Sequence, residues 1–230
     1  VINGPGGVFL NGLNVFTSAS IVSGGGNIDV TTTAGNLTGV TATSGAGTIN
    51  LNAAATLVTG TVTATNNTVA LTSGTGSIEL GSVAAGNSSI TAISGAAIVD
   101  AAGGGDAIAD ATAATIDLTA AGAGGIGQGG NGSVDINATT IFTADTLAGA
   151  DGDITVDDVT GDFPLGAVTA GTGSVTFDAV AGSITDANGG PVNITATGAT
   201  LSALNDIGDL NGGVVLAPVD SIETALSALT

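Results

Sequence analysis

Apolar and polar residues alternate in a short phrase that returns along most of the chain. The phrase is a glycine, a small polar residue and then an apolar-polar-apolar segment, as in residues 26–30, 47–51 and 173–177. Alternation with a period of two places the apolar side chains on one face of a β-strand and the polar ones on the other. The pattern therefore predicts many short strands, each with one buried face.

The first apolar residue of each phrase marks a repeat of about 20 residues. The markers are all β-branched, and the residue two positions further on is apolar in every case. They are Ile28, Ile49, Val69, Ile90, Ile116, Val134, Ile154, Val175, Val192 and Val214. One strong strand per repeat is typical of the coil of a parallel β-helix, which buries its apolar face by stacking on its neighbours. We therefore predict an all-β fold, a parallel β-helix (β-solenoid) with ten or eleven coils.

The repeat indicates a single solenoid domain over residues 1–230 with less regular ends. Residues 1–25 are expected to form an irregular first coil. Residues 220–230 form either a cap, with Ile222, Leu226 and Leu229 spaced like one face of a helix, or a truncated coil. The long interval between Ile90 and Ile116 contains three successive glycines at 103–105, which predicts a bulged loop there.

Composition narrows the class of partner. The 230 residues include no Lys, Arg or His, and the formal net charge is −19. Without a cation the chain has no means of neutralising phosphates, so we expect no nucleic acid partner and no binding to anionic membrane surfaces. No apolar run approaches the ~18 residues of a spanning helix, so no membrane insertion is expected. Val1 is neither a methionine nor followed by a basic segment, which predicts a removed leader or a longer parent protein.

Catalysis would have to rest on Asp, Glu, Ser or Thr alone. His, Lys and Cys, the usual bases and nucleophiles near neutral pH, are absent from the sequence. The adjacent pair Asp157 and Asp158 resembles the clustered aspartates of β-helix enzymes that cleave acidic polysaccharides, but adjacent strand residues point to opposite faces. We therefore expect no enzymatic activity and no required cofactor.

Calcium is the one cofactor that the acidic residues favour. Seventeen of the 19 acidic residues follow position 99. The repeat register predicts one outward column with Asp117 and Asp135 and a neighbouring one with Asp157 and Asp178, and stacked carboxylates repel unless a cation separates them. The candidate Ca²⁺ ligands are Asp117, Asp135, Asp151, Asp153, Asp157 and Asp178. The alternative is that exposed aspartates only keep a neutral rod soluble.

Threonine pairs offer a further alternative. Thr-x-Thr occurs at Thr31 with Thr33, at Thr41 with Thr43, and at Thr61, Thr63 and Thr65. Rows of this kind on a flat solenoid face are able to bind ice, but threonine is also common in strands for its intrinsic propensity. The pairs do not recur through the second half, so ice binding is the less favoured reading.

Two segments carry a family resemblance. Residues 182–190 (GSITDANGG) and 221–229 (SIETALSAL) resemble the repeats of filamentous-haemagglutinin-like proteins, which are large bacterial surface adhesins. The resemblance implies a secreted β-solenoid shaft at the cell surface. The secretion module of that family carries Asn-Pro-Asn signatures, whereas residues 3–7 read NGPGG, so the resemblance does not extend to an export signal.

Stacked coils that extend a rod indicate a structural role. Stacking within one chain uses the same contacts that would stack chain on chain. We therefore expect a structural subunit of an extracellular or cell-surface bacterial filament or matrix that associates with itself end to end. The alternative is a rigid shaft segment of a large secreted adhesin. A cell-surface or glycan partner is compatible with either role, but no residue identifies one.

Overall fold

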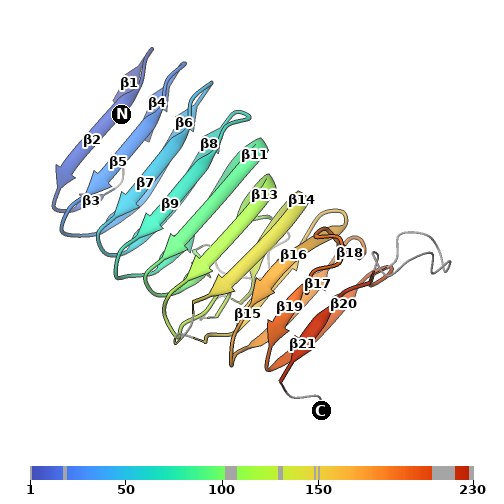
Figure 1. Ribbon diagram of the computed structural model, residues 1–230. Helices are drawn as coiled ribbons and strands as arrows, with labels where there is room; N and C mark the ends of the chain where they lie inside the picture. The colour runs from blue at the N-terminus through green and yellow to red at the C-terminus, as the bar shows by residue number, and fades with distance from the viewer. Residues whose placement is uncertain are drawn as a thin grey trace.

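The chain folds into a rod of stacked parallel strands. The computed structural model describes residues 2–17, 20–101, 108–128, 132–147, 149, 151–208 and 221–227. The coils follow one another along the axis, so the N-terminal and C-terminal coils lie at opposite ends (Figure 1). This confirms the predicted all-β solenoid, with about nine turns of about 21 residues where ten or eleven coils of roughly 20 residues were expected. At about 4.8 Å per coil the stack is about 40 Å long.

All regular elements of the described residues are strands. Within these ranges no helix is long and apolar enough to cross a membrane. The strands are β1 (Ile2–Gly4), β2 (Val8–Leu13), β3 (Phe16–Thr17), β4 (Ser20–Ser23), β5 (Ile28–Thr32), β6 (Leu37–Ser44), β7 (Ile49–Ala53), β8 (Leu57–Ala64), β9 (Val69–Ser73), β10 (Ile78–Leu80), β11 (Ser82–Ser94), β12 (Ile98–Asp100), β13 (Ala111–Ala120), β14 (Val134–Thr146), β15 (Ile154–Asp158), β16 (Phe163–Thr169), β17 (Ser174–Ala179), β18 (Ile184–Asp186), β19 (Ile194–Ala196), β20 (Gly198–Ala203) and β21 (Thr224–Leu226).

Each coil has three sides, and each side carries a column of inward-pointing apolar residues. The column of the first side is Val8, Ile28, Ile49, Val69, Ile90, Ile116 and Phe142. That of the second side is Phe16, Leu37, Leu57, Ile78, Ile98, Ile126, Ile154, Val175 and Ala199. That of the third side is Ile2, Ile21, Ala42, Val62, Val83, Ala111 and Ile136.

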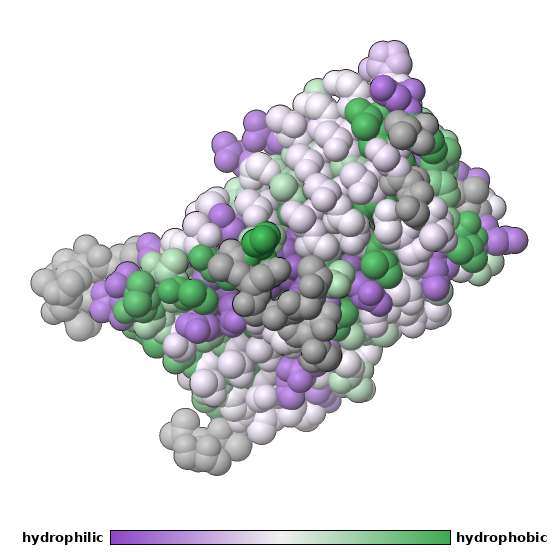
Figure 2. Space-filling model, turned by 180° about the vertical axis from the view of Figure 1, so that it is seen from behind, coloured by the Kyte–Doolittle hydropathy of each residue, from purple (hydrophilic) through white to green (hydrophobic). Residues whose placement is uncertain are grey.

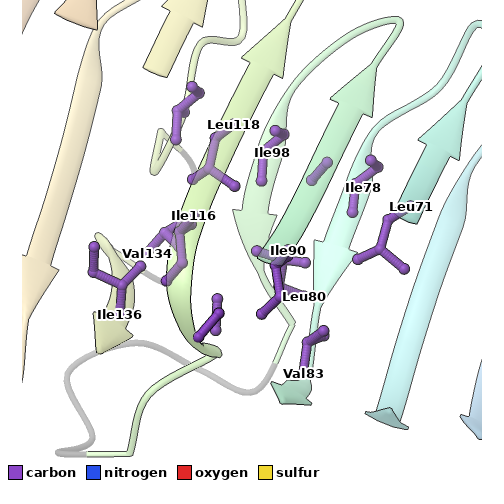
Figure 3. Close-up of a cluster of buried hydrophobic side chains, with 14 of the residues drawn as sticks. Leu71, Ile78, Leu80, Val83, Ile90, Ile98, Ile116, Leu118, Val134 and Ile136 are labelled. Atoms are coloured by element: carbon purple, nitrogen blue, oxygen red, sulfur yellow. The ribbon is translucent and has the colours of Figure 1, made fainter. Parts of the chain in front are cut away.

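The three columns meet in one narrow core. Leu71, Ile90 and Ile116 come from the first side, Ile78 and Ile98 from the second, and all five side chains are completely buried. Figure 3 shows these side chains pointing inward between successive strands. Small and β-branched residues fill this space because opposite sides are close together, which explains how a chain with 2% aromatic residues builds a continuous core.

The predicted register holds for the first half of the rod and then changes side. The markers from Ile28 to Ile116 form one column, but Val134 pairs with Val156, and Ile154 belongs to the second side. All three sides use the same apolar alternation, so the phrase does not identify the side on which it lies. Val192, also taken as a marker, is 45% exposed and Ile194 points inward instead. Val214 and the glycines at 103–105 lie outside the described residues.

The first and the last described strands join the stack. The first coil, expected to be irregular, forms β1, β2 and β3, which pair in parallel with β4, β5 and β6. Near the C-terminus β21 pairs in parallel with β19, so residues 224–226 form a strand and not the predicted helical face. Leu229 lies outside the described residues.

Glycines stack at a corner where successive backbones touch. A Cβ atom added to Gly47 would lie 2.3 Å from both the carbonyl carbon and the carbonyl oxygen of Gly26 in the preceding coil. Gly26 and Gly47 lie two residues before β5 and β7, and the ladder between these two strands fixes the distance between the coils at this corner. Glycine is required here for close approach of the two coils.

We expect Gly47→Ala to destabilise the rod by about 1–3 kcal/mol, because the added methyl group overpacks a rigid contact. Gly198→Ala is the matched control, since an added Cβ there meets nothing within 4 Å. Urea unfolding followed by circular dichroism measures both. Equal unfolding midpoints for the two variants would contradict the assigned corner contact.

Candidate functional site

Four aspartates occupy successive coils at one outward position of the third side, and we call them the acidic column. Asp135 pairs with Asp157, and Asp157 pairs with Asp178. Asp110 precedes Ala111, which pairs with Ile136, and the backbone N–H of Asp110 donates to the carbonyl oxygen of Asp135 at 2.7 Å. The neighbouring coils carry hydroxyl groups at this position, Ser82 before and Ser202 after.

Asp110 is the most perturbed member of the acidic column. Its side chain is 5% exposed, and burial raises its pKa to about 8. The carboxyl groups of Asp100 in β12 and Asp135 in β14 raise the pKa further, while the backbone N–H of Asp135, which donates to Asp110 Oδ2 at 3.0 Å, lowers it. The chain contains no cation to compensate these charges. The carboxyl group of Asp110 therefore holds a proton at neutral pH.

A serine joins the next two carboxylates of the column. Ser133 Oγ donates to Asp157 Oδ2 at 2.6 Å and lies 3.3 Å from Asp135 Oδ1. Burial raises the pKa of Asp157, the hydrogen bond from Ser133 lowers it, and the charge of Asp178 raises it. The column is thus held by hydrogen bonds from within the chain as well as by the strand ladder.

Asp158 points inward, in the apolar column of the third side. It pairs with Ile136 on one coil and Ala179 on the other, and its side chain is completely buried. The backbone N–H groups of Thr160 and Ala138 donate to its two carboxylate oxygens at 3.0 and 3.3 Å. Burial raises its pKa to about 7, against the lowering effect of these two hydrogen bonds. The adjacency of Asp157 and Asp158 was the available signal, because alternation forces one of them inward.

Perturbed carboxyl groups often mark catalytic sites, since they exchange protons near neutral pH. Here the burial that raises the pKa of Asp110 and Asp158 also closes both groups to a substrate. Their oxygens accept hydrogen bonds from backbone N–H groups of neighbouring coils. The arrangement therefore supports a structural role for these carboxyl groups.

The predicted calcium ligands do not lie together in the structure. Asp117 does not share a column with Asp135, which corrects the prediction: it lies on the first side, pairs with Thr143 and accepts a hydrogen bond from Thr143 Oγ1 at 2.9 Å. The error follows from the change of side after Ile116. The shared column of Asp157 and Asp178 is confirmed.

The remaining two candidate ligands lie before β15. Asp151 has a left-handed backbone with φ 46, and Asp153 Oδ1 accepts hydrogen bonds from the backbone N–H and the hydroxyl of Ser174 at 2.7 and 2.9 Å. Across the described ranges, no three acidic side chains are arranged to hold a metal ion. Calcium binding therefore stays a prediction that rests on the sequence.

The threonine pairs form only a short row. Thr43 and Thr63 share one outward column of the third side, but Ala84 takes this position in the next coil. Thr31 lies on the first side, in β5, and Thr65 follows the end of β8. The described surface thus brings complete Thr-x-Thr pairs together on two coils, through Thr41–Thr43 and Thr61–Thr63.

The face seen in Figure 2 is covered mainly by residues of intermediate hydropathy, with hydrophobic and hydrophilic residues scattered among them. Among the described residues visible on this face, no single patch stands out as a ligand site. Comparison with protein-family models, with curated proteins and with solved structures gave no match.

Proposed function

We propose that the chain is a non-enzymatic structural subunit of an extracellular or cell-surface bacterial filament or matrix, assembling end to end through its stacked coils. The supporting observation is that the apolar core residues are buried along the rod but only partly buried at its two ends. The partly buried apolar residues packed against the core are Ile2, Leu10 and Phe16 in the first coil, and Ala199, Leu201, Ala203, Ile222 and Leu226 in the last ones. A further coil at either end would cover them.

The strand edges at the two ends support the same role. Parallel ladders connect the described coils, and an uncovered edge offers a row of N–H and C=O groups to another chain. An extracellular place is supported by the resemblance to bacterial surface solenoids and by the lack of Lys and Arg, which leaves trypsin-like proteases no cleavage site. The role needs no cofactor.

Electron microscopy of the purified chain across a concentration series tests this function. We expect fibres that lengthen with concentration and repeat axially at about the length of one rod. Isolated short rods at every concentration would contradict end-to-end assembly and would favour the other role, a rigid shaft segment of a large secreted adhesin.

A further inference from the structure

We infer that the rods stack head to tail, with the first coil of one copy on the last coil of the next, so that the filament is polar. The inference rests on the proposed end-to-end assembly and specifies its partner, a second copy, and its direction. The head consists of β1, β2 and β3, and the tail consists of β20 and β21. A head-to-tail contact joins two different surfaces, so it can be repeated from one copy to the next and produces an open filament instead of a closed ring.

The three sides of the coil supply the first reason. At the head, β2 lies on the first side, β3 on the second and β1 on the third. At the tail, β21 continues the first side, while β20 continues the second through Ala199 and the third through Ala203. Placing head on tail brings each side onto the same side of the next rod with parallel strands, as in the described coils.

Contacts between two heads or two tails lose this match. One rod must then be turned end over end, which reverses the strand direction and exchanges two of the three sides. Every pairing at the interface would become antiparallel, with a different hydrogen-bond pattern. The free edges at both ends are already shaped by parallel neighbours, since β3 pairs with β6 and β20 pairs with β17 in parallel.

The second reason for head-to-tail stacking is the size of the partly buried core residues at the two ends. The head presents Phe16 in the second-side column and Ile2 in the third-side column, whereas the tail presents Ala199 and Ala203 in the same two columns. Large residues therefore meet small ones when head faces tail. Two tails that meet with the second and third sides exchanged would place Ala199 against Ala203 and leave the end of the core underfilled.

Charge supplies the third reason. Residues 2–17 of the head contain no charged side chain, whereas Asp206 and Glu223 flank the tail strands β20 and β21. Two tails in contact would bring carboxylates of the same sign together, and the chain has no cation to offset them. A neutral head on an acidic tail avoids this repulsion.

Two variants of the whole chain, each designed to block assembly at one end, test the direction of stacking. Leu10→Asp places a charge in the open core of the head, and Leu201→Asp does the same at the tail; both leucines are partly buried against the core. A carboxylate buried in an apolar interface without a partner of opposite charge is costly. It should therefore raise the concentration needed for assembly by roughly a hundredfold or more. The matched controls are Asn11→Asp and Thr200→Asp, which add the same charge at exposed neighbouring positions.

Analytical ultracentrifugation of each variant and of an equimolar mixture gives the answer. We expect each blocked variant alone to remain a single rod, the mixture to form pairs of two copies and nothing longer, and the controls to assemble like the unmodified chain. Pairs formed by Leu10→Asp alone would show tail-to-tail contact, and pairs formed by Leu201→Asp alone would show head-to-head contact; either result overturns the inference.

The same experiment separates this inference from the proposed function. If the unmodified chain also stays a single rod, end-to-end assembly itself fails, whatever the variants do. Circular dichroism checks that each variant keeps its strands. Should Leu10→Asp or Leu201→Asp unfold, Phe16→Asp and Ala199→Asp block the same two ends and are read by the same criteria.

Discussion

Replacing Phe163 with alanine is expected to lower the free energy of unfolding by about 3–5 kcal/mol. Phe163 is completely buried, and its ring lies between two other buried rings, 5.3 Å from Phe142 and 5.1 Å from Phe177 between centroids. All three pairs meet edge to face, the arrangement that aromatic quadrupoles favour. In the part of the chain that the structure describes, the other fully buried apolar side chains are aliphatic.

The cavity left by Phe163→Ala is not easily closed, because the strands around it are held in ladders. Phe142 pairs with Leu165, Phe163 pairs with Ile184, and Phe177 pairs with Val156 and Leu201. In a stack where each coil touches mainly its neighbours, the loss falls on the coils around the cavity. Hydrogen exchange should therefore show faster opening of β16 to β20 than of β5 to β9.

Chemical unfolding with two comparison variants measures the effect. Phe9→Ala removes the same side chain from a position that is 69% exposed and should change stability by no more than a few tenths of a kcal/mol. Phe163→Leu keeps part of the volume and should lose less than Phe163→Ala. A loss for Phe163→Ala no greater than that for Phe9→Ala would contradict the assigned packing of the three rings.

The solenoid was predictable because strand alternation and a constant repeat are local properties of the sequence. Ile28, Ile49, Val69 and Ile90 follow one another at intervals of 20 or 21 residues, and Ile116 follows after a longer one. The structure stacks all five in one column. The pattern does not show on which of the three sides of the coil a strand lies. Each side repeats the same apolar-polar alternation, so the change of side before Val134 leaves no local trace.

The acidic column was predictable only in part, for the same reason. Asp157 and Asp178 are one repeat apart in adjacent strands, so spacing alone placed them together. Asp110 follows an insertion of irregular length, and no repeat count relates it to Asp135. Asp158 sits in an apolar column, where its burial depends on backbone N–H groups of Thr160 and Ala138 that only the folded chain brings together.

Raising the pH from 5 to 8 is expected to destabilise the folded rod. The folded-state pKa is about 8 for Asp110 and about 7 for Asp158, against 3.8 for an ordinary aspartate. Between these values the folded chain holds protons that the unfolded chain has released, so unfolding releases protons and becomes more favourable as the pH rises. The slope is up to about 1.4 kcal/mol per pH unit for each group. The stabilisation is complete below about pH 4 and lost above about pH 8.

Asp110→Asn should remove most of the contribution that Asp110 makes to the pH dependence of stability. An asparagine oxygen is able to accept the hydrogen bond from the Asp135 backbone N–H, and its amide is able to donate to the neighbouring carboxyl group of Asp100. The variant should therefore match the unmodified chain near pH 5 and be more stable at pH 8. Thermal unfolding across this range, with Asp153→Asn as a control that makes the same substitution at an exposed position, measures the difference. A curve for Asp110→Asn that runs parallel to that of the unmodified chain would show that Asp110 does not carry the buried proton, whereas convergence at low pH and separation at high pH would assign the proton to it.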